Sequence, residues 1–123
     1  MSENVKTAVV LVVEDESLLR SFAVEMVEDA GFIAIEASNA DEAIAILERR
    51  TDIRILFTDI HMPGSIDGLK LAHAVRNRWP PVKIIIASGQ VRLATEDMPT
   101  NSRFFSKPYG QKELTSALVE MTA

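Results

Sequence analysis

The sequence of 123 residues contains no cysteine, only two histidines and no long hydrophobic run. Without cysteine there is no disulfide framework, no thiolate metal site and no cysteine nucleophile. Two histidines are too few for a histidine-rich metal centre. The longest apolar run is far shorter than the ~20 residues that span a bilayer, and the polar start from Met1 to Thr7 lacks the apolar core of a signal peptide. We therefore expect a cytoplasmic protein that does not contact membranes.

The chain also lacks an excess of positive charge, because its formal net charge is −5. Proteins that bind nucleic acid need clustered lysine and arginine to neutralise phosphates, so no direct contact with nucleic acid is expected. Two nucleotide-binding motifs are missing as well, namely a Walker-type glycine-rich loop and a G-x-G-x-x-G turn after the first apolar run. Their absence disfavours a nucleoside triphosphatase and a dinucleotide-dependent enzyme.

Short apolar runs alternate with amphipathic runs of about a dozen residues, a pattern typical of βαβ units. The predicted strands are Ala8–Val13, Phe32–Ala37, Ile53–Thr58, Val82–Ala87 and Arg103–Ser106. The predicted helices are Ser17–Ala30, a helix from an Asn39 cap to about Arg50, Gly68–Arg78, Gln111–Met121 and a short one within Val91–Glu96. We therefore expect one α/β domain over residues 1–123, with a doubly wound five-stranded parallel sheet.

Polar side chains follow four of these strands at the point where each strand ends. They are Glu14 and Asp15, then Asp59, then Ser88, and finally Lys107. The carboxyl ends of the strands in an open α/β sheet face one crevice, where ligands bind. Three carboxylates, a hydroxyl and an ammonium at this edge suit a divalent cation and the transfer of a phosphoryl group to a carboxylate.

Each carboxylate has a functional interpretation and a simpler one. Asp59 could be the nucleophile that forms an acyl phosphate, or it could only cap a turn. Glu14 and Asp15 could hold Mg²⁺, with Asp15 bound directly and Glu14 more loosely, or they could interact with the dipole of the following helix. The backbone carbonyl of His61 is a further possible ligand of the ion.

The lysine and the serine also have two interpretations each. Lys107 could pair with Asp59 before reaction and with the phosphoryl group afterwards, although most lysines are solvated surface residues. Ser88 could donate to a phosphoryl oxygen, although a lone serine before glycine is usually a turn residue. The Lys107–Pro108 bond is a candidate cis peptide. His73 lies within a predicted helix, and we expect it to be structural or solvated.

From about Val9 to Leu118, the chain resembles the receiver domains of two-component response regulators. The resemblance is carried by Val10–Asp15, Asp59–Pro63, Asp67–Gly68, Ser88–Gly89 and Lys107–Pro108. It implies a flavodoxin-like sheet with strand order 2-1-3-4-5. It also implies that Asp59 accepts the phosphoryl group, Glu14 and Asp15 hold Mg²⁺, and Ser88 and Lys107 sense the phosphoryl group. The donor would be a histidine kinase or a phosphotransfer protein, and the domain would be a signalling switch rather than a conventional enzyme.

The chain departs from the common receiver pattern in several places. Glu14 stands where aspartate is more frequent, and Gly64–Asp67 is one residue longer than usual. The stretch between Ser88 and Phe104 is short, and Phe104 occupies the place of the switch aromatic. By the same resemblance, His61 and Gln90 flank the path of the attacking water, and we expect them to tune the lifetime of the phosphorylated state.

Several functions remain open at this point. One is a stand-alone switch that binds a downstream protein through the face formed by the stretch after Ser88, the strand Arg103–Ser106 and the last helix. Another is a phosphate sink or shuttle without a protein output, and a third is a receiver excised from a hybrid kinase. A metal-dependent hydrolase or a flavin-binding domain is disfavoured, because the chain lacks loops that would form a substrate pocket.

Overall fold

The computed structural model of the chain describes residues 8–60, 67–89 and 97–123. The described residues form one five-stranded parallel sheet in the order β2-β1-β3-β4-β5. The strands are β1 (Val9–Val13), β2 (Ile33–Ala37), β3 (Ile53–Asp59), β4 (Lys83–Ser88) and β5 (Ser102–Ser106). The helices are α1 (Ser17–Asp29), α2 (Ala40–Arg49), α3 (Gly68–Arg78) and α4 (Gln111–Thr122). The predicted fold class and strand order are confirmed.

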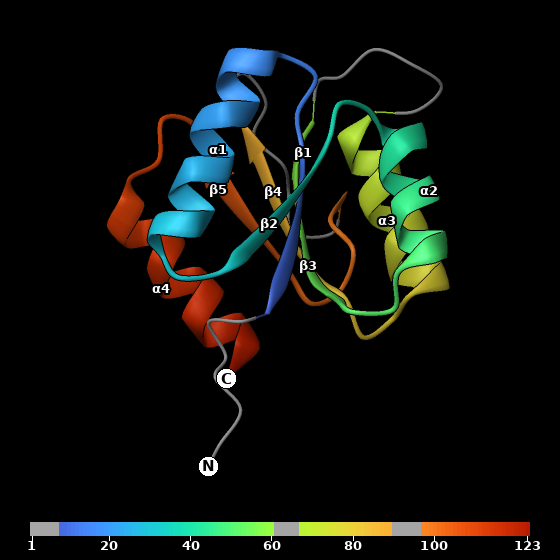
Figure 1. Ribbon diagram of the computed structural model, residues 1–123. Coiled ribbons are helices and arrows are strands. Elements are labelled where there is room, and N and C mark those ends of the chain that lie inside the picture. The colour runs from blue at the N-terminus through green and yellow to red at the C-terminus, as the bar shows by residue number, and fades with distance from the viewer. Residues whose placement is uncertain (1–7, 61–66, 90–96) are drawn as a thin grey trace.

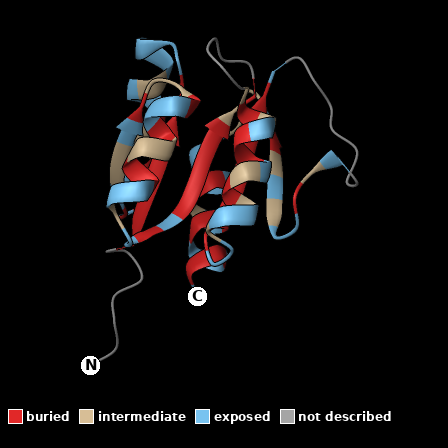
Figure 2. Cartoon of the chain, turned by 90° about the vertical axis from the view of Figure 1, so that its right-hand side faces the viewer, coloured by how far each residue is buried: buried red, intermediate tan, exposed pale blue. Residues whose placement is uncertain are grey.

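The helices cover both faces of the sheet (Figure 1). Helices α1 and α4 lie on one face, and α2 and α3 lie on the other. Each face has its own apolar core, one formed with α1 and α4 and the other with α2 and α3. Buried residues gather on the strands and on the inner sides of the helices, whereas exposed residues follow the outer sides (Figure 2).

Strand β1 is buried along its whole length, as its continuous apolar sequence predicts. It pairs with β2 on one side and β3 on the other, so its five residues contact helices on both faces. Both sides of this strand are therefore closed to water. Its carboxyl end, where Glu14 and Asp15 follow, is held in the middle of the sheet.

Side-chain caps and a glycine set several helix boundaries. Asn39 accepts a hydrogen bond from the Glu42 amide at 2.8 Å at the start of α2, as predicted from the sequence. Asp67 caps α3 in the same way, by accepting from the Lys70 amide at 2.9 Å. Gly31 follows α1 with a φ of 96°, a conformation that costs glycine little.

The predicted elements agree with the observed ones to within one residue at each end. Strand β3 extends one residue further than predicted, to Asp59, and β4 extends to Ser88. The short helix predicted within Val91–Glu96 lies outside the described residues. No helix among the described residues has the length and hydropathy needed to cross a bilayer.

Helix α1 carries its apolar residues on two sides. Ala23 and Val27 are buried against the sheet, whereas Leu18 and Phe22 are 61% and 53% exposed. The helical spacing of apolar residues correctly predicts this helix. It does not show that part of the apolar stripe remains on the surface.

Candidate functional site

The acidic residues predicted from the strand ends come together at the carboxyl edge of the sheet. Strands β1 and β3 are neighbours, and Val13 is paired with Thr58, which brings Glu14 level with Asp59. Carboxylate oxygens of Glu14, Asp15 and Asp59 lie within 4.8 Å of one another. The three negative charges therefore repel one another strongly unless a cation offsets them.

Lys107 supplies a positive charge to this cluster from the end of β5. Its ammonium Nζ lies 2.7 Å from Asp59 Oδ1 and 3.3 Å from Glu14 Oε1. The Lys107 amide donates to the Ser88 carbonyl at 2.9 Å, which fixes the start of the side chain beside β4. The Lys107–Pro108 bond is cis, as the sequence predicted. One ammonium thus contacts carboxylates from two different strand ends.

Burial strengthens the charge interactions within the cluster. The side chains of Glu14 and Asp59 are 9% and 11% exposed, and that of Lys107 is 28% exposed. Burial raises the pKa of Glu14 above its usual value, and the charge of Asp59 adds to the rise, while the Glu16 amide and Lys107 oppose it. Burial lowers the pKa of Lys107, but Asp59 and Glu14 outweigh it and leave that pKa raised.

The backbone holds the acidic loop in place. The Glu14 amide donates to the Ala37 carbonyl at the end of β2 at 3.1 Å. The Glu14 side chain folds back over the loop, and its Oε2 accepts from the Glu16 amide at 3.2 Å. Glu16 is the N-cap of α1 and makes no hydrogen bond with its own side chain there. Glu14 therefore takes part in both the cluster and the start of the helix.

Gly68 packs directly against the backbone of the residue that ends β3. A Cβ atom at Gly68 would lie 1.7 Å from the carbonyl oxygen of Asp59, far closer than any real contact. The Gly68 amide also donates to the Ile60 carbonyl at 2.8 Å. The first turn of α3 therefore supports the backbone that carries Asp59, and only glycine fits this approach.

The oxygen donors of the cluster fit a magnesium ion. Mg²⁺ prefers hard oxygen ligands and takes one or two carboxylates, with waters and phosphate oxygens completing its shell. Asp15 is exposed and Asp59 is partly buried, while Glu14 is buried and already hydrogen-bonded. The donor set and its burial therefore suit an ion held by Asp15 and Asp59, with Glu14 beside it.

The remaining predicted site residues lie in different places. Ser88 is buried at the end of β4, next to the acidic cluster in the strand order. Phe104 on β5 is partly buried and packs against the core on the α2 and α3 side. The proposed roles of His61 and Gln90 concern positions outside the described residues. His73 is exposed on α3, as expected, and its Nε2 lies 2.9 Å from the Asp97 carbonyl oxygen.

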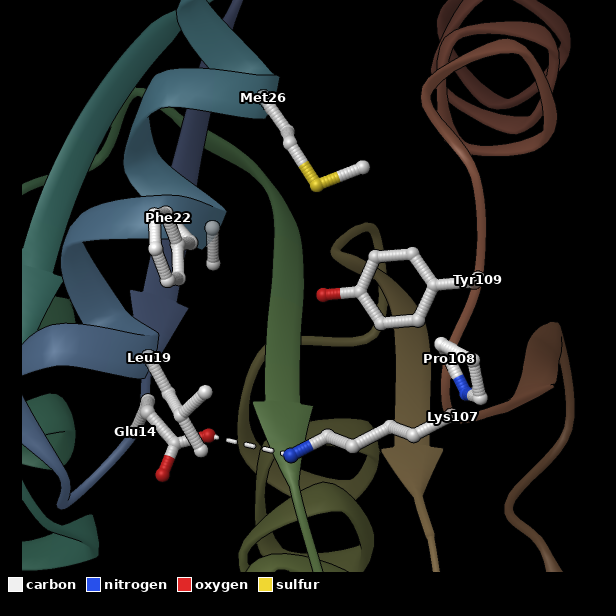
Figure 3. Close-up of a pocket in the computed structure, with 8 residues that line it drawn as sticks. Glu14, Leu19, Phe22, Met26, Lys107, Pro108 and Tyr109 are labelled. Atoms are coloured by element: carbon white, nitrogen blue, oxygen red, sulfur yellow. Dashed lines mark hydrogen bonds and ion pairs between the residues drawn. The ribbon is translucent and has the colours of Figure 1, made fainter.

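An apolar pocket of about 540 Å³ lies beside the cluster, between α1 and the segment after β5 (Figure 3). Leu19, Phe22 and Met26 line it from α1, and Tyr109 lines it from the opposite side. Glu14 and Lys107 form its polar end. The ring of Tyr109 packs on the rings of Phe57 and Phe105, with a distance of 5.7 Å between ring centroids in both pairs. Tyr109 therefore covers part of the sheet.

The sequence did not single out Arg20, which contacts the acidic loop. Arg20 Nη1 donates to the Glu14 carbonyl at 2.9 Å, and Nε donates to Glu36 Oε1 at 3.1 Å. The position of an arginine one turn after the acidic pair is the only sequence signal for this contact. That signal is weak, because arginine is common on the exposed faces of helices.

Known proteins agree with this architecture. A family model for the response regulator receiver domain matches residues 10–119. The receiver protein CpdR of Brucella abortus is 30% identical over 91% of this chain and 94% of its own length. The sensor kinase CckA of the same bacterium is 32% identical over 94% of this chain, which spans only 12% of that kinase.

Solved structures show the same fold. A response regulator receiver protein from Sinorhizobium medicae has a TM-score of 0.87 at 25% identity, over 97% of both chains. The receiver domain of the hybrid histidine kinase CckA has a TM-score of 0.79 at 29% identity, over 94% of this chain and 99% of that one. The chain belongs to the response regulator receiver domain family, the phospho-accepting module of two-component signalling.

Proposed function

We propose that Asp59 is the residue that receives the phosphoryl group, and that Glu14, Asp15, Ser88 and Lys107 complete the site. The observation that carries this proposal is the 2.7 Å contact between Lys107 Nζ and Asp59 Oδ1 at the end of β3, within a cluster of three carboxylates. The ammonium of Lys107 holds the Asp59 carboxylate at the strand end, and an aspartate carboxylate can act as a nucleophile that forms an acyl phosphate.

The chain's residues favour phosphoryl transfer mainly through position and charge. An Asp59 oxygen forms a bond to phosphorus while the phosphorus–nitrogen bond of a phosphohistidine donor breaks. The released imidazole takes up a proton from water and leaves neutral. When bound, Mg²⁺ would offset the negative charge between the carboxylates and the phosphoryl oxygens.

Lys107 can contact Asp59 both before and after phosphorylation. Its ammonium is already in contact with the carboxylate, and a flexible point charge can follow the larger anion that forms there. Ser88 stands at the end of the next strand, where its hydroxyl would donate to a phosphoryl oxygen. We propose these two residues as the readers of the phosphorylated state, with Phe104 on β5 carrying the change outward.

Residues 1–123 act, in this proposal, as one receiver domain whose donor is a histidine kinase or a phosphotransfer protein. The relative CpdR, which has nearly the same length as this chain, supports a receiver that works without a fused output domain. The output would then be the binding of a downstream protein, with a phosphate sink as the alternative outcome. We expect this domain to act in the cytoplasm.

Acetyl phosphate provides a test that needs no knowledge of the kinase. With Mg²⁺, the intact mass of the chain should rise by one phosphoryl group, and Asp59→Asn should abolish the increase. Asp52→Asn is the matched control, because Asp52 lies exposed near the start of β3 and pairs with Arg50 at 2.7 Å. Labelling of Asp59→Asn, or none of the unsubstituted chain, would contradict the assignment.

A further inference from the structure

The loop that carries Glu14 and Asp15 connects β1 to α1 over only three residues, Glu14 to Glu16. Its amino end is attached to β2 through the hydrogen bond from the Glu14 amide to Ala37. Its carboxyl end begins α1 without a side-chain cap at Glu16. On the helix side, the Glu16 amide donates to Glu14 Oε2 at 3.2 Å, and a second contact to the loop comes from a side chain within α1.

Arg20 holds the loop from the helix side. Its guanidinium donates to the backbone carbonyl of Glu14 at 2.9 Å. A hydrogen bond from a charged donor is stronger than a neutral one. The same guanidinium contacts Glu36 on β2 at 3.1 Å. Arg20 thus connects three elements, namely the acidic loop, the first helix and the edge strand.

The burial of Arg20 distinguishes it from an ordinary surface ion pair. Its side chain is only 19% exposed, compared with 40% and 50% for Arg50 and Arg78 in two other ion pairs of the structure. An exposed pair contributes little by itself. The bond to the Glu14 carbonyl is different, because it fixes the backbone of a residue whose side chain lies in the cluster.

If Arg20 acted only through its charge, it would weaken the binding of a metal ion. A positive guanidinium near three carboxylates repels a cation, so its removal would strengthen the binding of Mg²⁺. A residue that fixes the ligands in place has the reverse effect, because groups that orient metal ligands strengthen binding by about 10- to 100-fold. The sign of the change in affinity therefore separates the two roles.

We propose that Arg20 is a positioning residue for the magnesium site, acting through the Glu14 carbonyl to hold the loop that presents Asp15 and Glu14. This inference rests on the proposed function, since it assumes that the acidic cluster binds Mg²⁺. Arg20 does not touch the ion or the phosphoryl group. It sets the geometry of the residues that do.

The test is the affinity of the unphosphorylated chain for Mg²⁺ alone, measured by titration calorimetry. Arg20→Ala should weaken binding about tenfold. Arg20→Lys should also weaken it, because lysine keeps the charge but cannot donate to Glu14 and Glu36 with one planar group. Arg50→Ala is the matched control and should leave the affinity unchanged. Equal or tighter binding by Arg20→Ala would overturn the proposal.

A second readout concerns the metal-free chain. Loss of the arginine should speed the exchange of the Glu14 and Glu16 amides with solvent, while the amides of β4 stay protected. Unchanged exchange at the loop would contradict a positioning role even if the affinity fell. If the unsubstituted chain bound no Mg²⁺, the proposed function would fail. Normal binding by Arg20→Ala would instead contradict the role of Arg20 alone.

Discussion

The backbone of Gly68 lies so close to Asp59 that a single added methyl group would meet the Asp59 carbonyl oxygen at 1.7 Å. The first turn of α3 is therefore in van der Waals contact with the strand end that carries the proposed phosphoacceptor. Neither the strand nor the helix can shift without affecting the other. The stability of the fold and the position of Asp59 are coupled at this one glycine.

Replacement of Gly68 by alanine should lower the stability of the fold and displace Asp59. We expect Gly68→Ala to lower the free energy of unfolding by about 2–3 kcal/mol, as overpacking of a close contact does, and to slow phosphorylation by acetyl phosphate. Urea unfolding measures the first effect. Gly110→Ala is the control, because no atom lies within 4 Å of a Cβ there. Replacing this N-cap glycine of α4 should lower the free energy of unfolding by less than about 1 kcal/mol. Equal losses at the two positions would contradict this account of Gly68.

The single tyrosine offers a direct measurement of burial near the site. Burial raises the pKa of Tyr109 to about 12 from the usual 10.0. The folded chain therefore keeps this proton more tightly than the unfolded chain, and stability should fall as the pH rises from 10 toward 12. The absorbance of the phenolate, recorded rapidly after a pH jump, should have a midpoint near 12 in the folded chain and near 10 in urea. A folded midpoint near 10 would show that the ring is solvated.

Glu14 should destabilise the metal-free chain at neutral pH. Its raised pKa means that the folded state binds the proton more tightly than the unfolded state, whose value is 4.5. Its contribution to stability therefore falls as the pH rises through the folded pKa. In the presence of a chelator, Glu14→Gln should be more stable than the unsubstituted chain, with a larger gain at neutral pH than at pH 4.5.

The control for this comparison is Glu48→Gln, since Glu48 is exposed and pairs with Arg78 at the surface. That variant should show no such pH-dependent gain. Chemical unfolding at the two pH values gives the comparison. A loss of stability in Glu14→Gln at neutral pH would mean that the contact with Lys107 outweighs the burial of the carboxylate.

Lys107 and a magnesium ion should compete for the same carboxylates. The ammonium contacts both Asp59 and Glu14, so its removal leaves negative charge that a cation can offset. We expect Lys107→Met to tighten Mg²⁺ binding roughly fivefold, the effect of one partly solvated unit charge near the ion. Lys112→Met, on the exposed side of α4, should not change the affinity. Weaker binding by Lys107→Met would show that the lysine helps to hold the ion's ligands.

The sequence predicts the layout of the site because strand ends are local features. Continuous apolar runs mark the buried strands, and the polar residues that follow each run lie at the shared edge, so the sequence alone places Asp15, Asp59 and Lys107 there. Contacts between residues that are not adjacent in the sequence produce no such pattern. The approach of Gly68 to Asp59, the contact from Arg20 to Glu14 and the balance of charges on Glu14 depend on distances that only the folded chain defines.

The exposed side of α1 shows a second limit of the sequence pattern. Leu18 and Phe22 share the helical spacing of the buried residues, and spacing alone does not reveal which part of an apolar stripe meets the sheet. Helix α1 packs against β1, β2 and α4, and Leu18 and Phe22 remain exposed beside these contacts.

The chemical identity of the phosphorylated residue tests the central claim most directly. After treatment with acetyl phosphate and Mg²⁺, reduction with borohydride converts an aspartyl phosphate to homoserine, and mass spectrometry of the peptides then locates it. We predict homoserine at position 59 and at no other aspartate, and none when Mg²⁺ is removed by a chelator. Homoserine at Asp15 or another position, with an unmodified Asp59, would contradict the account.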